Sequence, residues 1–212
     1  ADFAASYQYG CVFLGDGHGG FTSGDTGLPG RNGLSLGDVD GDGCKDIAFT
    51  SGGRPHVAVW RGDHWEQASA GLPASGSYEA TELCDMNSDG VLDLVATGDG
   101  ACTVWLGDGG GAWAAAGGFT APSANEVAAF RAGGDFDHNG FPDVALVQEE
   151  GDWINYRNYL YVYRESSLPS ARFVRGQSPR SHETICVGSA QRLRWTAARM
   201  GTDPATIRLE IS

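Results

Sequence analysis

The sequence predicts an all-β protein built from repeated four-stranded antiparallel units. The main observation is an acidic stretch of nine residues that occurs three times: DVDGDGCKD at 38–46 (loop one), DMNSDGVLD at 85–93 (loop two) and DFDHNGFPD at 135–143 (loop three). The copies recur about every 50 residues, which is the length of four short strands with their turns. Glycine makes up 33 of the 212 residues, about twice its usual share, and this favours many turns and few helices.

Each unit has the same expected order of strands. A short apolar run enters the acidic loop and another leaves it, as residues 34–37 and 47–50 do around loop one. Such runs, bounded by glycine, are typical of strands. A hairpin signal follows at residues 59–65 and 104–113, where a glycine-rich turn leads into an aromatic ring. One unit is therefore strand A, acidic loop, strand B, connection, strand C, turn and strand D, which matches one blade of a β-propeller.

The repeated units cover most of the chain. Three full units are expected at residues 33–74, 78–123 and 127–176. In the third unit, strand C is expected at 159–163 and strand D at 171–174. Residues 1–30 supply only a strand C and a strand D, which make an N-terminal half-blade. Residues 1–178 are therefore interpreted as a β-propeller-type array of antiparallel blades.

Residues 179–212 are interpreted as a short C-terminal β segment. Its strands are expected at residues 183–187, 191–195 and 206–211. In one interpretation they act as strands A and B of the N-terminal half-blade and close a four-bladed ring. In the other they begin an Ig-like sandwich, which three strands cannot complete without strands from another chain. Both alternatives leave sheet edges that must be covered.

Each acidic loop has the oxygen-rich pattern that a hard cation requires. Positions 1, 3 and 5 carry Asp or Asn, position 6 is a glycine that permits a sharp bend, and position 9 is Asp. Calcium takes about six to eight oxygen ligands, so the backbone carbonyl at position 7 is expected to contribute. The predicted metal ligands are Asp38, Asp40, Asp42, Cys44 and Asp46 in loop one, Asp85, Asn87, Asp89, Val91 and Asp93 in loop two, and Asp135, Asp137, Asn139, Phe141 and Asp143 in loop three.

We expect up to three Ca²⁺ ions, one in each loop. An EF-hand is excluded because its glutamate at position 12 is replaced by Phe49, Ala96 and Leu146. Magnesium fits less well, since it prefers to keep its waters in a rigid octahedron. Asparagine at positions 87 and 139 lowers the charge of loops two and three, so loop one is expected to bind most tightly.

These loops and their spacing resemble the FG-GAP/VCBS repeat family, whose blades carry Asp-x-Asp-x-Asp-Gly-x-x-Asp loops between strands A and B, as in integrin α-subunit propellers. The resemblance covers about residues 10–176. It implies a β-propeller, calcium in the loops, an extracellular location and a role in adhesion or recognition without catalysis. The chain departs from the family in its blade count, because three full units are too few to close the usual ring.

The amino-acid composition limits which classes of partner and which cellular compartment are expected. The net charge is −13, and ten of the 27 acidic residues lie in the three loops, so the acidity is largely a metal-site signature. It argues against nucleic acid, whose phosphates attract basic patches. No apolar run is long enough to span a membrane, and any signal peptide is expected to have been removed. The five cysteines are compatible with one or two disulfides in a secreted protein.

No catalytic motif is present, and we expect the protein not to be an enzyme. The expected partner is a protein or glycan ligand at the cell surface or matrix. Two alternatives stay open: a subunit of an extracellular filament joined through its incomplete terminal strands, and a carbohydrate-binding accessory domain of a secreted hydrolase. Trp65 and Trp113 are interpreted as fillers between blades. Trp153 and tyrosines 156, 159, 161 and 163 are the candidates for an exposed aromatic patch.

Overall fold

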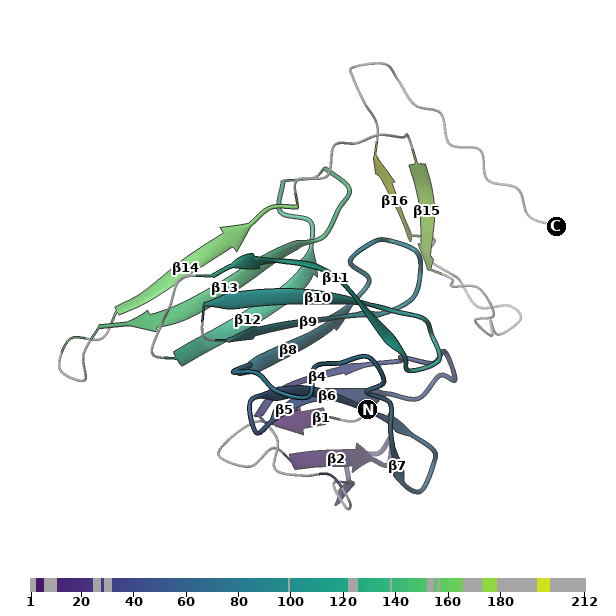
Figure 1. Ribbon diagram of the computed structural model, residues 1–212. Helices are drawn as coiled ribbons and strands as arrows, with labels where there is room; N and C mark the ends of the chain where they lie inside the picture. The colour runs from purple at the N-terminus through teal and green to yellow at the C-terminus, as the bar shows by residue number, and fades with distance from the viewer. Residues whose placement is uncertain are drawn as a thin grey trace.

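The computed structural model is all-β: the residues that it describes form strands and no helix (Figure 1). None of them forms a helix long and apolar enough to cross a membrane. The described residues are 3–5, 11–24, 28, 32–98, 100–121, 126–137, 139–151, 155, 157–165, 173–178 and 194–198.

Two of the predicted four-stranded units are confirmed as complete antiparallel sheets. Blade one consists of β4 (Asn32–Gly37), β5 (Asp46–Ser51), β6 (Arg54–Trp60) and β7 (Trp65–Gln67). Blade two consists of β8 (Ala80–Cys84), β9 (Asp93–Gly98), β10 (Ala101–Gly107) and β11 (Trp113–Thr120). In both, strands pair in chain order, and an acidic loop joins the first strand to the second.

The third unit differs from the prediction at its last strand. Blade three consists of β12 (Glu126–Gly134), β13 (Asp143–Glu150) and β14 (Arg157–Tyr163), paired in that order. The expected fourth strand at residues 171–174 is wrong, because β15 (Phe173–Ser178) pairs with β16 (Arg194–Ala198) in a separate sheet. An apolar run shows that a strand forms but not which edge it joins.

The N-terminal sheet has three strands rather than the expected half-blade of two. Its strands are β1 (Phe3–Ala5), β2 (Cys11–Gly15) and β3 (Phe21–Ser23), with β2 in the middle. Strand β1 occupies the edge of β2 that ring closure would assign to a C-terminal strand. The predicted strands at 183–187 and 206–211 lie outside the described residues, and the strand expected at 191–195 begins three residues later, as β16. The Ig-like alternative stays a prediction.

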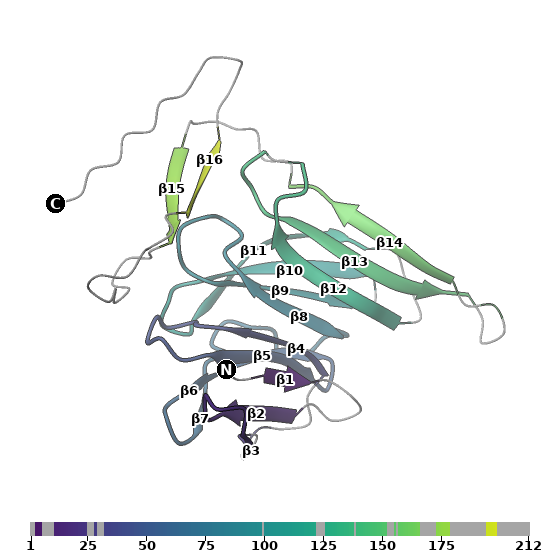
Figure 2. The ribbon, with the colours of Figure 1, turned by 180° about the vertical axis from the view of Figure 1, so that it is seen from behind.

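The four sheets stack face to face in chain order, and the β15–β16 pair lies apart from them (Figures 1 and 2). In β5, Ile47 and Phe49 pack with Val12 of the N-terminal sheet, whereas Ala48 packs with blade two. The residues of β9 alternate in the same way, with Val95 toward blade three. Because β5 and β9 are each covered on both faces, each begins with an unbroken apolar run after its aspartate.

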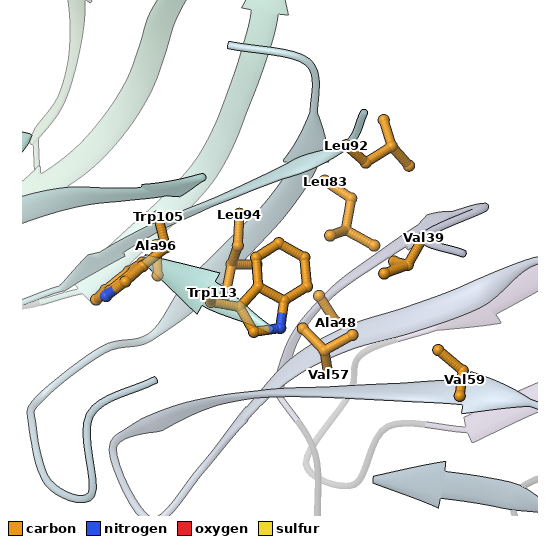
Figure 3. Packing of buried hydrophobic residues seen from close by; sticks show 10 residues of the cluster. All are labelled: Val39, Ala48, Val57, Val59, Leu83, Leu92, Leu94, Ala96, Trp105 and Trp113. Atoms are coloured by element: carbon orange, nitrogen blue, oxygen red, sulfur yellow. The ribbon is translucent and has the colours of Figure 1, made fainter. Parts of the chain in front are cut away.

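Tryptophans join successive sheets, as predicted for Trp65 and Trp113. Figure 3 shows Trp113 in the core between blades one and two. Its indole Nε1–H donates to the carbonyl of Ala68, just after the last strand of blade one (2.7 Å). Trp65 donates in the same way to the carbonyl of Gly24, just after the last strand of the N-terminal sheet (2.5 Å). Each ring thus ties its blade to the preceding sheet.

Candidate metal centres

The aspartate at position 9 of each loop is the residue that holds the loop in place. Asp46, Asp93 and Asp143 open the second strand of their blades and are fully buried, at 0%, 0% and 1% exposure. In each, Oδ2 accepts the backbone N–H of position 2 (2.7 Å in all three loops). The other oxygen, Oδ1, accepts an N–H from the last residue of the third strand, Trp60 or Gly107, or in blade three from Glu165, two residues after that strand (2.8–3.0 Å). One carboxylate therefore joins the loop to strand C.

The remaining loop positions repeat a second set of contacts. The carboxylate at position 1 accepts the N–H of the glycine at position 6, from Gly43 to Asp38 (3.2 Å), and equivalently at 2.9 Å in loops two and three. These glycines have φ of 89°, 92° and 93°, a conformation that other residues rarely adopt. The position 5 side chain accepts the N–H of position 7 at 2.7–2.8 Å. All three loops thus share one backbone path.

This path brings carboxylate oxygens together. In loop one, Asp38, Asp40 and Asp42 each offer an oxygen within 4.8 Å of the others, and in loop three Asp135, Asp137 and Asp143 do so. Oδ1 of Asp38 is buried and has no hydrogen-bond partner in the described part of the chain. A buried carboxylate oxygen without a donor is costly unless a cation binds it. The donor set, all hard oxygen, fits calcium.

Loop two differs because Asn87 takes the place of a carboxylate at position 3. Its Oδ1 accepts the N–H of Asp89 (2.9 Å), and its Nδ2 donates to the side chain of the same residue (2.9 Å). The amide oxygen is a neutral ligand for a hard cation. Loop two therefore keeps the backbone path of the other loops and, like loop three, has one carboxylate fewer than loop one.

Electrostatics in the loops favour a cation. Burial raises the pKa of Asp46, and the backbone N–H groups of Trp60 and Val39 oppose this rise. Burial also raises the pKa of Asp93, against hydrogen bonds from Gly107 and Met86. Buried negative charge that backbone dipoles only partly compensate is stabilised by a bound positive ion.

Residues just after the third strands reach the loops, and the sequence pattern did not reveal them. Arg61 follows β6 and forms an ion pair with Asp40 of loop one. Arg164 lies 3.7 Å from Asp137 of loop three, and the carbonyl of Glu165 accepts from Asn139 Nδ2 (3.4 Å). Only the strand order, which returns strand C to the loop, places them there.

Other predicted features are partly corrected. Cys44, Cys84 and Cys102 are free, so at most one of the expected disulfides can form among the five cysteines. The expected aromatic patch is reduced among its described residues, because Tyr161 and Tyr163 pack on the core between blades two and three, whereas Tyr159 is 40% exposed. The hydroxyl of Tyr161 donates to Glu150, and this hydrogen bond raises the pKa of Tyr161 to about 12. Residues 153 and 156 lie outside the described residues.

Comparison with known families finds a match to the repeated unit and none to a whole protein. A family model described as an FG-GAP-like repeat matches residues 38–96 and 85–146. Each match begins at the first residue of one acidic loop and runs through the next loop, and together they cover half of the chain. No curated protein matches the chain.

Proposed function

The chain belongs to the FG-GAP-like repeat family, and on this premise we propose that it is a calcium-binding, non-catalytic module that works outside the cell in adhesion or recognition. The observation that supports this proposal most is the shared loop path. In each loop the position 9 aspartate is tied to strand C. Three carboxylates gather in loop one (Asp38, Asp40 and Asp42) and three in loop three (Asp135, Asp137 and Asp143).

Bound calcium would stabilise the corner between the first two strands of each blade. It neutralises carboxylates that otherwise repel one another, and binding to the folded state alone stabilises that state by mass action. Extracellular calcium modules bind with dissociation constants of about 0.1 to 1 mM, which suits loops as exposed as these. The partner is proposed to be a protein or glycan ligand at the cell surface or in the matrix.

The first prediction is a calcium-dependent melting temperature. At a few millimolar calcium, each occupied loop adds about 1–2 kcal/mol to the free energy of unfolding. Three loops would then raise the melting temperature by about 10 °C relative to chelator, given about 2–4 °C per kcal/mol for a chain of this size. Differential scanning calorimetry in calcium, in magnesium and in EDTA measures the shift.

Single-loop variants provide the control. Asp137→Ala is expected to abolish binding in loop three and leave loops one and two, so calorimetric titration should lose one equivalent of calcium. Equal melting temperatures of the wild type in calcium and in EDTA contradict the proposal.

Assembly is a second candidate function, favoured by the outer face of blade three. Leu160 and Val162 of β14 are 67% and 47% exposed. Leu160 and Val162 pair with Val147 and Ala145 of the neighbouring strand β13. Ala145 corresponds to Ala48 of blade one and Val95 of blade two, and both of those residues are covered by the following sheet. The outer face of blade three is thus of the type that packs against a following sheet, and no sheet among the described residues covers it.

We propose that the N-terminal sheet of a second copy occupies this face. Phe21 of β3 is 50% exposed and lies opposite Gly15, on the face away from Val12 and Leu14, which pack on blade one. The two ends of the stack therefore carry complementary types of face, and head-to-tail packing would repeat the contacts made inside the chain.

The second prediction tests this assembly. Leu160→Glu is expected to abolish concentration-dependent self-association in analytical ultracentrifugation, because it places a charge in the proposed interface. Ala115→Glu, on exposed β11, is the matched control and should associate like the wild type. A wild type that stays monomeric at high concentration contradicts assembly by this face.

A further inference from the structure

Arg61 is the first residue after β6 and begins the turn to β7. Its backbone N–H donates to the carbonyl of His64 (2.9 Å), which holds the turn. The preceding residue, Trp60, donates its N–H to Asp46 Oδ1 at the end of loop one (2.9 Å). These two backbone contacts bring Arg61 beside the candidate metal loop.

The Arg61 guanidinium bridges two carboxylates. Nη1 donates to Asp40 Oδ2 (2.5 Å) and Nε donates to Glu66 Oε2 (2.6 Å). The other oxygen of Asp40 accepts the N–H of Asp42 (3.3 Å), so both oxygens of this candidate ligand already have a donor. The Asp40 side chain is 14% exposed and the Arg61 side chain 38%, so this charge-assisted pair is partly exposed.

The other two loops have no equivalent contact among the described residues. In loop three, Arg164 Nη1 lies 3.7 Å from Asp137 Oδ2, which is too far for a hydrogen bond. In loop two, position 3 is the neutral Asn87, whose amide donates to Asp89. Loop one is therefore set apart by a guanidinium hydrogen-bonded to a candidate metal ligand.

We propose that Arg61 is a built-in competitor that lowers the calcium affinity of loop one, an inference that rests on the proposed calcium-binding function. The guanidinium holds the carboxylate oxygen that calcium needs, and its positive charge repels the ion. Calcium must displace Arg61 from Asp40, after which Glu66 still pairs with the arginine. Loop one, which has the most carboxylates, then binds calcium less tightly than its charge alone would allow.

The test uses a readout that resolves the three loops. The amides of Gly43, Gly90 and Gly140 each donate to the position 1 carboxylate of their own loop, so their NMR signals report calcium binding site by site. Wild type, Arg61→Gln and Arg54→Gln are titrated with calcium. Arg54→Gln removes the same charge from the opposite end of β6, where the guanidinium donates to the carbonyl of Ala74 (3.3 Å).

Arg61→Gln is expected to lower the calcium concentration at the Gly43 midpoint by about fivefold, the upper range for one partly exposed ion pair. Arg54→Gln should leave this midpoint at the wild-type value, and the Gly90 and Gly140 midpoints should not move in either variant. Equal Gly43 midpoints in the two variants overturn the inference while calcium binding stands. A Gly43 signal that ignores calcium while Gly90 and Gly140 respond also overturns it. If no loop responds in the wild type, the proposed function itself fails.

Discussion

Replacing Asp93 by alanine is expected to destabilise the protein by about 3–5 kcal/mol, even without calcium. The carboxylate is fully buried and accepts the backbone N–H groups of Met86 (2.7 Å), Asn87 (3.3 Å) and Gly107 (3.0 Å). Alanine leaves these donors without a partner inside blade two, and each buried donor left unsatisfied costs about 1–3 kcal/mol. Urea unfolding in EDTA, followed by circular dichroism, measures the loss.

Asp89→Ala is the matched control for this prediction. Asp89 lies in the same loop and carries the same group, but it is exposed and accepts the N–H of Val91 (2.8 Å) at the surface. In EDTA its removal is expected to cost about 1 kcal/mol or less, as for other exposed hydrogen bonds. Equal losses in the two variants would show that Asp93 has no special role as the link between loop and strand C.

Trp113→Ala is expected to cost about 3–5 kcal/mol and to loosen the contact between blades one and two. The ring is 5% exposed and packs among Val57, Leu83 and Leu94 (Figure 3). Alanine leaves a cavity in this core and frees the carbonyl of Ala68 that the indole N–H now satisfies. Chemical denaturation measures the loss of stability, and hydrogen exchange of β6 and β10 amides shows whether it concentrates at this interface.

Trp60→Ala provides the comparison, because Trp60 is half-buried and its ring contacts that of Trp65 at 4.9 Å between centroids. Its loss is expected to be about 1–2 kcal/mol. A Trp113→Ala variant as stable as Trp60→Ala would mean that the indole does not hold the two blades together.

The backbone path of the loops could be predicted because their chemistry is local. The Asp and Asn pattern, the bend at Gly43 and its counterparts, and the strands on either side all depend on residues within nine positions of one another. The same locality explains why the hairpins of blades one and two were predicted with nearly the right bounds. The hydrogen bonds from the position 9 aspartates to strand C could not be predicted from the sequence. Their partners Trp60, Gly107 and Glu165 lie 14 to 22 residues further along the chain.

Two predictions about which strand joins which sheet edge were wrong. Residues 173–178 have the composition of a strand, yet they pair with β16 instead of β14. The three residues of β1 are too few to give a periodic signal, so the third strand of the N-terminal sheet was missed. Edge pairing depends on which partner is close in space, and apolar alternation carries no information about that.

The sequence by itself determined the all-β class, the repeat and the oxygen-rich loops, because strand alternation, turn glycines and ligand spacing act over a few residues. The tertiary structure alone decided that Arg61 reaches Asp40, that Tyr161 and Tyr163 face the core, and that Leu160 and Val162 stay uncovered. Those outcomes depend on how separate sheets stack, and stacking brings together residues that no local pattern connects.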